Sequence, residues 1–232
     1  AKLEIPDHME RETQFLCCKP THEAYDFYGD QFITSDGKEH SVENYNLIIN
    51  ERVVRHSFAK RGQYNGKPFT VGALARVLLL GDRLEGKARE AYEKLVTRRW
   101  YRNPIFNNHA QAIELIHSLQ YIPEIVNQIL TFAKSKVAKP KNKTGTGTGA
   151  VEAPRGTLIH HYEIKDGLIS RADIITPTVM FLDDIEEFIR MSGSRLLAKN
   201  PLDRIELEFE KIARAYDPCI SCSSHIVEVK YK

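Results

Sequence analysis

Apolar side chains recur at helical spacing over the longest periodic stretch of the chain, 108–136. Their positions lie on one stripe of a helix, which predicts a helix that faces the core. They are Ile113, Ile116, Leu119, Ile125, Ile129 and Phe132. Pro123 lies within this stretch and lacks a backbone donor, so we expect the helix to be kinked or split there.

Helical spacing also marks two shorter stretches before it, 71–80 and 83–99, which are separated near Gly81. We expect a further short helix over 42–54. Residues 1–60 otherwise carry an irregular pattern that is typical of short strands and loops.

Two more helices are predicted near the end of the chain, over 183–197 and 202–216. Asn200 suits the N-cap of the second helix, and Pro201 suits its first helical position because proline already has the required φ. The Asp-Pro pair at 217–218 ends this helix.

Strands are predicted where β-branched and aromatic residues flank a turn. The stretches 157–164 and 168–176 are joined by Lys-Asp-Gly and form a clear hairpin, which Pro177 ends. A smaller hairpin is expected between 32–34 and 41–42, around Ser-Asp-Gly. The fold class is therefore α+β and predominantly helical, with helices packed against small β-hairpins.

The stretch 139–151 is rich in Gly, Thr and Lys, and we interpret it as a loop. A phosphate-binding loop is disfavoured because neither G-x-G-x-x-G nor a Walker lysine is present. This loop divides the chain into a mixed segment over 1–138, with part of a helical bundle, and a segment over 152–232 that holds the hairpin, helices and end motif. We expect the two segments to form one continuous domain.

Composition is that of an ordinary soluble domain: 232 residues, 42% hydrophobic and 28% charged. The formal net charge of +2 gives no reason to expect a nucleic-acid partner. No apolar run approaches the roughly 18–20 residues of a membrane span. Four cysteines do not make a disulfide scaffold and fit a reducing cytoplasm better. The chain starts without an initiator methionine, so we expect a piece of a longer protein.

Chemistry concentrates in the end motif at 217–225, Asp-Pro-Cys-Ile-Ser-Cys-Ser-Ser-His. Cys219 and Cys222 can place two sulfurs on one side of a turn, and thiolates select soft or borderline metals. By itself a C-x-x-C pair also fits half of a structural zinc site, a redox dithiol or two buried cysteines. Cys17 and Cys18 are adjacent and therefore badly placed to chelate one ion.

The wider context resembles the large subunit of nickel–iron hydrogenases. The resemblance rests on 152–162 (Glu-Ala-Pro-Arg-Gly-Thr-Leu-Ile-His-His-Tyr), 175–178 (Ile-Thr-Pro-Thr) and the end motif, in the order and spacing of that family's C-terminal half. The Gly-Thr-Gly-Thr-Gly run at 145–149 also fits. The stretch 64–80 resembles the cytoplasmic multimeric branch, which includes sulfhydrogenases and enzymes linked to pyridine nucleotide or to F420.

The resemblance implies a nickel–iron centre whose iron carries two cyanides and one carbon monoxide. It implies that Cys219 is a terminal nickel ligand and a proton acceptor, and that Cys222 bridges nickel and iron. By the same resemblance we expect Arg155 to be the guanidinium over the open metal position, where it stabilises charge, and Asp217 to pair with it.

Further roles follow from the same resemblance. The backbone at Pro154 and the hydroxyl of Thr178 correspond to groups that hydrogen-bond the cyanides. His225 corresponds to a ligand of a nearby magnesium ion, together with the carbonyl of Ile174.

The chain departs from the family pattern at two places. The family's other cysteine pair, in an Arg-x-Cys-Gly-x-Cys context, is absent, since no cysteine lies between Cys18 and Cys219. We therefore expect a truncated large subunit that is inactive alone. Phe181 stands where the family usually has Asn, which removes a supporting hydrogen bond. The tail at 226–232 is retained, which predicts a metal-free state before cleavage by a maturation endopeptidase.

The resemblance also implies partners: dihydrogen, an iron–sulfur small subunit, diaphorase or other electron-transfer subunits, and nickel-insertion factors. The face buried against the small subunit should be an exposed apolar surface in this chain. Two other functions stay open. One is a non-catalytic zinc or redox module. The other is a quinone-site homologue related to complex I, which the retention of both cysteines disfavours.

Overall fold

The computed structural model describes residues 5–132, 144–198 and 205–223. A small sheet with the order β3-β2-β1-β6 lies at its centre. Its strands are β1 (Gln14–Lys19), β2 (Gln31–Thr34), β3 (Glu39–Ser41) and β6 (Phe69–Thr70). β6 pairs with β1 in parallel, and the other pairs are antiparallel. The predicted small hairpin is present as β2 and β3.

A second hairpin follows the short helices η2 (Val42–Asn44) and α1 (Tyr45–Ile48). It consists of β4 (Ile49–Val54) and β5 (Ser57–Tyr64). The helix predicted over 42–54 is therefore wrong beyond Ile48. The β-branched residues of 49–54 pair across the hairpin with β5, and that pairing outweighs the weak helical pattern.

The predicted helices over 71–80 and 83–99 appear as α2 (Ala73–Leu80) and α3 (Gly86–Leu95), separated by η3 (Gly81–Arg83). After η4 (Arg98–Arg102) comes α4 (Phe106–Thr131). α4 packs beside α2 and α3 on one side of the molecule. α4 continues through Pro123 to Thr131, so the proline does not split it. The carbonyl that loses a donor belongs to Leu119, in an exposed turn of the helix.

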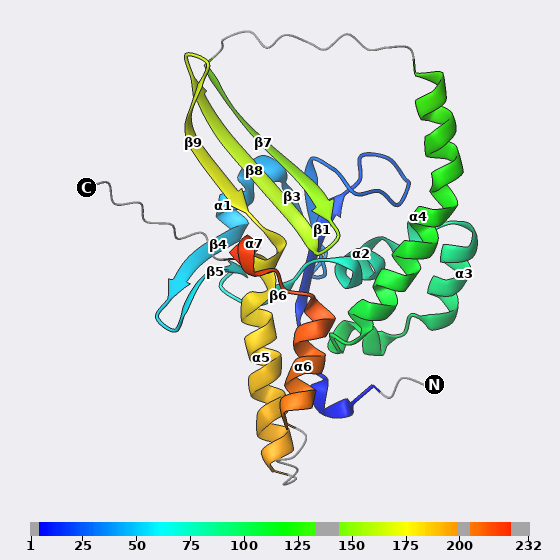
Figure 1. The fold of residues 1–232 in the computed structure, drawn as a ribbon, viewed down its shortest axis with the longest axis vertical. Helices are drawn as coiled ribbons and strands as arrows, with labels where there is room; N and C mark the ends of the chain where they lie inside the picture. Colours follow the sequence, from blue (N-terminus) through cyan, green and yellow to red (C-terminus); the bar gives the residue numbers. More distant parts are fainter. Residues whose placement is uncertain (1–4, 133–143, 199–204, 224–232) are drawn as a thin grey trace.

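The prediction that the α4 stripe faces the core is wrong for its second half. Ile113 is fully buried, but Leu119, Ile125 and Ile129 are exposed, as is Phe132 just beyond the helix. Only the first half packs on α2 and α3, and the second half projects away from them (Figure 1). An amphipathic pattern predicts a covered face, but the cover is not in the described part of this chain.

The third sheet, with the order β7-β8-β9, is antiparallel. It consists of β7 (Gly145–Ala153), β8 (Gly156–Lys165) and β9 (Leu168–Ile175), and it confirms the predicted hairpin. The loop predicted over 139–151 is wrong from Gly145 onward, because β7 pairs with β8 along nine positions that include 145–151. Residues 139–143 lie outside the described residues.

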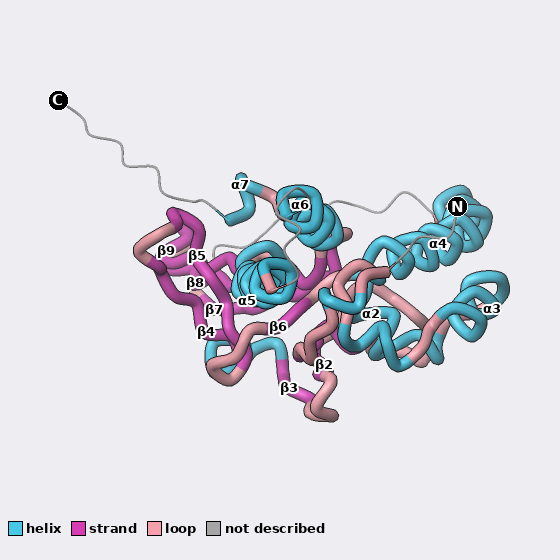
Figure 2. The backbone as a smooth tube through the Cα atoms, turned by 90° about the horizontal axis from the view of Figure 1, so that it is seen from below, coloured by secondary structure: helices cyan, strands magenta, loops and turns pink. Residues whose placement is uncertain are grey.

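α5 (Pro177–Leu197) begins six residues earlier than predicted, since Pro177 starts a helix as well as ending the strand. α6 (Ile205–Tyr216) confirms the last long helix. Its expected cap residues, Asn200 and Pro201, lie outside the described residues. α5 and α6 run side by side (Figure 2), and a short helix, α7 (Ile220–Ser223), follows.

One buried core joins distant parts of the chain. It includes Leu16 of β1, Phe69 of β6, Ile159 of β8 and Phe188 of α5. The predicted α+β class with small hairpins is confirmed. Within the described residues, no helix is long and apolar enough to cross a membrane. The division at 139–151 stays a prediction.

Candidate metal site

The cysteine loop begins where α6 ends. Asp217 has a φ of 50°, a left-handed conformation that stops the helix and turns the chain. α7 then places Cys222 one helical turn after Cys219, with 2.8 Å between their Sγ atoms. Both thiols are partly exposed and free. Two sulfurs on one open side of a turn can chelate one ion.

The first turn of α5 holds this loop in place. The Thr178 hydroxyl oxygen accepts a hydrogen bond from the Cys219 backbone N–H at 3.2 Å. The Thr176 hydroxyl donates to the Cys222 carbonyl at 2.6 Å. Thr178 is 1% exposed, so its side chain is fixed by packing. The positions of both cysteines therefore depend on α5.

Arg155 reaches the loop from the turn between β7 and β8. Its Nε donates to the Asp217 carbonyl at 2.7 Å, and a terminal nitrogen donates to the Asp217 carboxylate at 3.1 Å. This turn packs against the start of α2 at a distance that only glycine allows. A Cβ on Gly72, whose φ is 107°, would lie 2.8 Å from the Arg155 carbonyl oxygen.

A buried network of charged residues lies under this turn. Glu152, with its side chain fully buried, accepts from the Cys18 backbone N–H, from Thr157 and from Arg76. Arg76 is 1% exposed and also donates to Glu114 and to the carbonyl of Ala153. The network fixes the end of β7 against α2 and α4.

Sequence reasoning missed Arg76 and Glu114. The available signal was the arginine inside the otherwise apolar run 73–80, since a lone buried guanidinium requires carboxylate partners.

The two thiols differ in acidity. Hydrogen bonds from the Cys222 thiol and then the Ser221 hydroxyl lower the pKa of Cys219 to about 7, and the Arg155 guanidinium adds to this. The pKa of Cys222 is raised because its thiol donates to Cys219 and because it is less exposed to solvent. Cys219 is thus the thiol that ionises first.

Cys17 and Cys18 take no part in the site. Both are fully buried in β1, and they pack into different core clusters on opposite faces of the strand. Burial raises both of their thiol pKa values well above the ordinary one. Both thiols are closed off from solvent, unlike those of the cysteine loop.

The structure brings most of the predicted site residues together. Arg155 contacts Asp217, Cys219 contacts Cys222 and Thr178, and Pro154 adjoins Arg155 with its carbonyl 3.4 Å from Arg76. Ile174 lies at the end of β9, two residues before Thr176, and His225 lies outside the described residues.

As a donor set, the loop fits half of a soft-metal site. Two thiolates with a nearby guanidinium suit nickel or another thiophilic ion. Among the described residues, no group of three or more His, Cys, Asp or Glu side chains gathers at one point. Phe181 is buried against the ring of Tyr216, with centroids 5.5 Å apart, so this position serves packing and offers no hydrogen bond to the site.

With this geometry in place, residues 20–225 match the family of nickel-dependent hydrogenases. The chain belongs to this family. It is 41% identical to sulfhydrogenase 1 subunit alpha of Pyrococcus furiosus over 99% of its own length and 54% of that subunit. It is 37% identical to sulfhydrogenase 2 subunit alpha of the same organism, over 87% of this chain and 48% of the relative.

Its fold is similar to that of an NAD⁺-reducing [NiFe]-hydrogenase solved in the H2-reduced state. The TM-score is 0.81 at 25% identity, and the likeness covers 94% of this hydrogenase-family chain and 52% of the solved one. The chain thus spans about half the length of the curated relatives it matches.

Proposed function

We propose that this chain is the C-terminal portion of a nickel–iron hydrogenase large subunit and supplies Cys219 and Cys222 to the metal centre. The observation that carries the proposal is the pair of sulfurs 2.8 Å apart on a loop that Thr178 anchors and Arg155 faces. Two thiolates are half of a four-thiolate nickel site, so the chain alone is inactive.

When bound, the nickel–iron centre supplies the metal chemistry that splits dihydrogen into protons and electrons, with two cyanides and one carbon monoxide on the iron. Cys219 would hold the centre as a terminal ligand, and its lowered pKa favours the thiolate form that ligation requires. Its Sγ would also be the atom that accepts a proton. Cys222 would be the second thiolate that holds the centre, in the bridging role.

The remaining residues of the proposed site place charge and hydrogen-bonding groups around the metal centre. Arg155, held by Asp217, directs positive charge at the site, and its planar fork is fixed before any ligand binds. The Thr178 hydroxyl accepts from Cys219 and keeps its own proton available to donate to a cyanide, next to the backbone of Pro154. His225 and the carbonyl of Ile174 are proposed magnesium ligands.

Partners of the complete enzyme follow from the same proposal. The chain's relatives are named as subunits, and a similar solved structure is an NAD⁺-reducing enzyme. We therefore propose an iron–sulfur small subunit, diaphorase or other electron-transfer subunits, nickel-insertion factors and a cytoplasmic location. The tail at 226–232 is the proposed substrate of a maturation endopeptidase and lies outside the described residues.

The test is metal content. The chain is produced together with the half of a large subunit that it lacks and with maturation factors, and nickel, iron and hydrogen-dependent dye reduction are measured. Cys219→Ser and Cys222→Ser should each abolish nickel binding and activity, and Cys17→Ala should retain both. Stoichiometric zinc in place of nickel, lost on Cys219→Ser, would support the zinc module instead.

A further inference from the structure

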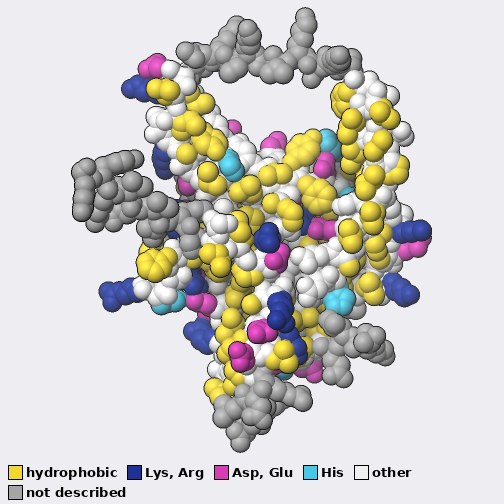
Figure 3. All heavy atoms as spheres, in the orientation of Figure 1, with side chains coloured by type: hydrophobic (Ala, Val, Ile, Leu, Met, Phe, Trp, Pro, Cys, Tyr) yellow, Lys and Arg dark blue, Asp and Glu magenta, His cyan; other side chains and the backbone are white. Residues whose placement is uncertain are grey.

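The hollow beside the Pro154 turn opens between two parts of the chain. It has a volume of about 480 Å³ and is lined on one side by Gln111, Leu115 and Ser118 of α4. On the other side lie Ala153 and Pro154 at the end of β7. Two rows of exposed residues lead away from this hollow, one along β7 and one along α4, whose apolar side chains Figure 3 shows.

The α4 row is apolar over its whole length. Leu115, Leu119, Ile122, Val126 and Leu130 follow one another at spacings of three and four residues, so they share the face that lines the hollow. Their exposed fractions lie between 47% and 77%. Residues on the opposite face of the same turns are polar: Glu124 and Gln128. This half of α4 is amphipathic, and its exposed apolar face suits a partner outside the described residues.

The β7 row is made of glycine. Side chains alternate along a strand, and Thr148 faces the packed side of the sheet, where it contacts His161 at 2.9 Å. Gly145, Gly147 and Gly149 therefore face the other side, in line with Val151 and with Ala153 at the hollow. A Cβ on any of the three glycines would have no heavy atom within 4 Å.

Nothing within the described chain explains these three glycines. Each costs about 0.5–1 kcal/mol relative to alanine in a strand, and a strand glycine often marks the close approach of another backbone. In register beside Gly147 and Gly149 lie Tyr162 and His160, joined by a hydrogen bond of 2.7 Å. On this face of the sheet, the edge strand β7 therefore has no side chains at its three glycines, and the neighbouring strand β8 presents two aromatic rings.

We propose that this cradle, formed by the α4 row, the hollow and the β7 row, seats the polypeptide that brings the two remaining thiolates. This inference rests on the proposed function. The floor of the cradle contains Pro154, and its neighbour Arg155 faces the cysteine loop, so a segment seated there reaches the metal site. That segment belongs to the half of the large subunit that the relatives possess and this chain does not span.

The dimensions favour a polypeptide over a small molecule. The α4 row extends about 22 Å at a rise of about 1.5 Å per residue, and the β7 row about 26 Å. A helix of about 15 residues fills such a length. An iron–sulfur subunit or a second copy of the chain would cover the apolar face without completing the thiolate set.

The experiment mixes the purified chain with the separately produced part of Pyrococcus furiosus sulfhydrogenase 1 subunit alpha that lies outside the matched region. A chelator is present, so binding is measured independently of metal. We expect a one-to-one complex and slowed amide hydrogen exchange over 115–130 and Gly145–Ala153. Gly147→Leu and Val126→Glu should each weaken binding about 10- to 100-fold.

Two matched controls lie next to these positions. Thr146→Leu adds the same side chain on the other face of β7, and Gln128→Glu adds the same charge on the polar face of α4; both should bind like the unchanged chain. No complex, protection elsewhere, a homodimer that protects the same amides, or equal loss in the controls would overturn the proposal. A complex in the cradle that never takes up nickel would overturn the proposed function alone.

Discussion

Arg155 holds Asp217 through two different groups, the carbonyl and the carboxylate of the same residue. The pair joins the β7–β8 turn to the end of α6, so two segments 62 residues apart meet at the cysteine loop. Because Asp217 is in the left-handed conformation, its carbonyl and side chain both point to the guanidinium. The position of the positive charge is thus fixed by both elements.

Replacing Arg155 with lysine keeps the charge but loses the planar fork. In the completed enzyme we expect Arg155→Lys to lower hydrogen-dependent dye reduction by about 100-fold, as for the loss of one oriented donor. Nickel content should not change. Arg190→Lys, on an exposed position of α5, is the control. Full activity in Arg155→Lys would show that charge alone suffices.

Cys219 should be the reactive thiol of the metal-free chain. Its pKa of about 7 means that it is protonated and slow below pH 7 and a thiolate above it, whereas an ordinary thiol ionises near 9.0. At pH 7 we expect iodoacetamide to modify Cys219 at least about tenfold faster than Cys222, by peptide mass spectrometry.

The midpoint of that pH profile should rise in Cys222→Ala, which removes the main hydrogen-bond donor to Cys219. Cys17 and Cys18 serve as internal controls, since burial should keep both unmodified in the folded chain. Equal rates at Cys219 and Cys222 would contradict the assignment.

The buried network at the end of β7 should contribute strongly to folding. Arg76→Met leaves the carboxylates of Glu152 and Glu114 without their cation, and we expect a loss of about 3–5 kcal/mol in the free energy of unfolding by urea. Arg89→Met removes an exposed pair with Glu93 and should cost less than about 1 kcal/mol. Similar costs for both variants would refute the role of burial.

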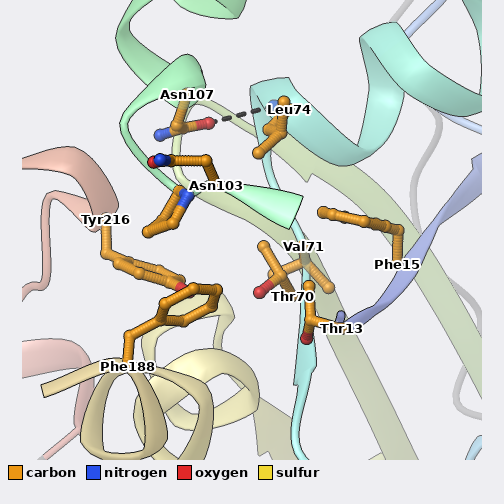
Figure 4. Close-up of a pocket in the computed structure, with 10 residues that line it drawn as sticks. Thr13, Phe15, Thr70, Val71, Leu74, Asn103, Asn107, Phe188 and Tyr216 are labelled. Carbon is orange, nitrogen blue, oxygen red and sulfur yellow. Dashed lines mark hydrogen bonds between the residues drawn. The ribbon is translucent and has the colours of Figure 1, made fainter. Parts of the chain in front are cut away.

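A second buried carboxylate, Asp184 on α5, accepts from Arg11, Thr13, Thr70 and Tyr216. Three of these donors, Thr13, Thr70 and Tyr216, also line a small cavity (Figure 4). Asp184→Asn places amide hydrogens against these donors.

We therefore expect Asp184→Asn to lower the free energy of unfolding by about 3–5 kcal/mol, and Tyr216→Phe by about 1–2 kcal/mol. Thermal denaturation compared with Asp166→Asn, in an exposed turn, measures both effects. A change within about 0.5 kcal/mol for Asp184→Asn would show that the carboxylate is dispensable.

The features that could be predicted from the sequence are those that a local residue pattern determines. The β8–β9 hairpin follows from its turn and its β-branched residues, and the cysteine loop follows from the order of the motifs. The sequence did not predict β7, because glycine is depleted in strands and alternates with threonine here, so the pairing with β8 decides. It also did not predict the strand over 49–54, where pairing with β5 outweighs a weak helical pattern.

Two further features could not be predicted from the sequence, because they depend on contacts between distant residues. The pairing of Arg76 with Glu114 joins residues 38 positions apart, which no spacing rule reveals. The stripe on α4 showed an apolar face but not what covers it, so Leu119 and Ile129 were assigned to a core that the described chain does not form. An amphipathic pattern identifies the apolar face of a helix, but only the tertiary structure shows what packs against that face.

The anchoring of the cysteine loop by Thr176 and Thr178 has an electrostatic consequence. Both residues stand at the start of α5, a helix of 21 residues, so the loop lies against its N-terminal end. Peptide dipoles leave partial positive charge at that end, and this charge favours anions by about 0.3–1 kcal/mol each. Deprotonation of the two thiols, which any metal binding requires, is thereby made less costly by the backbone itself.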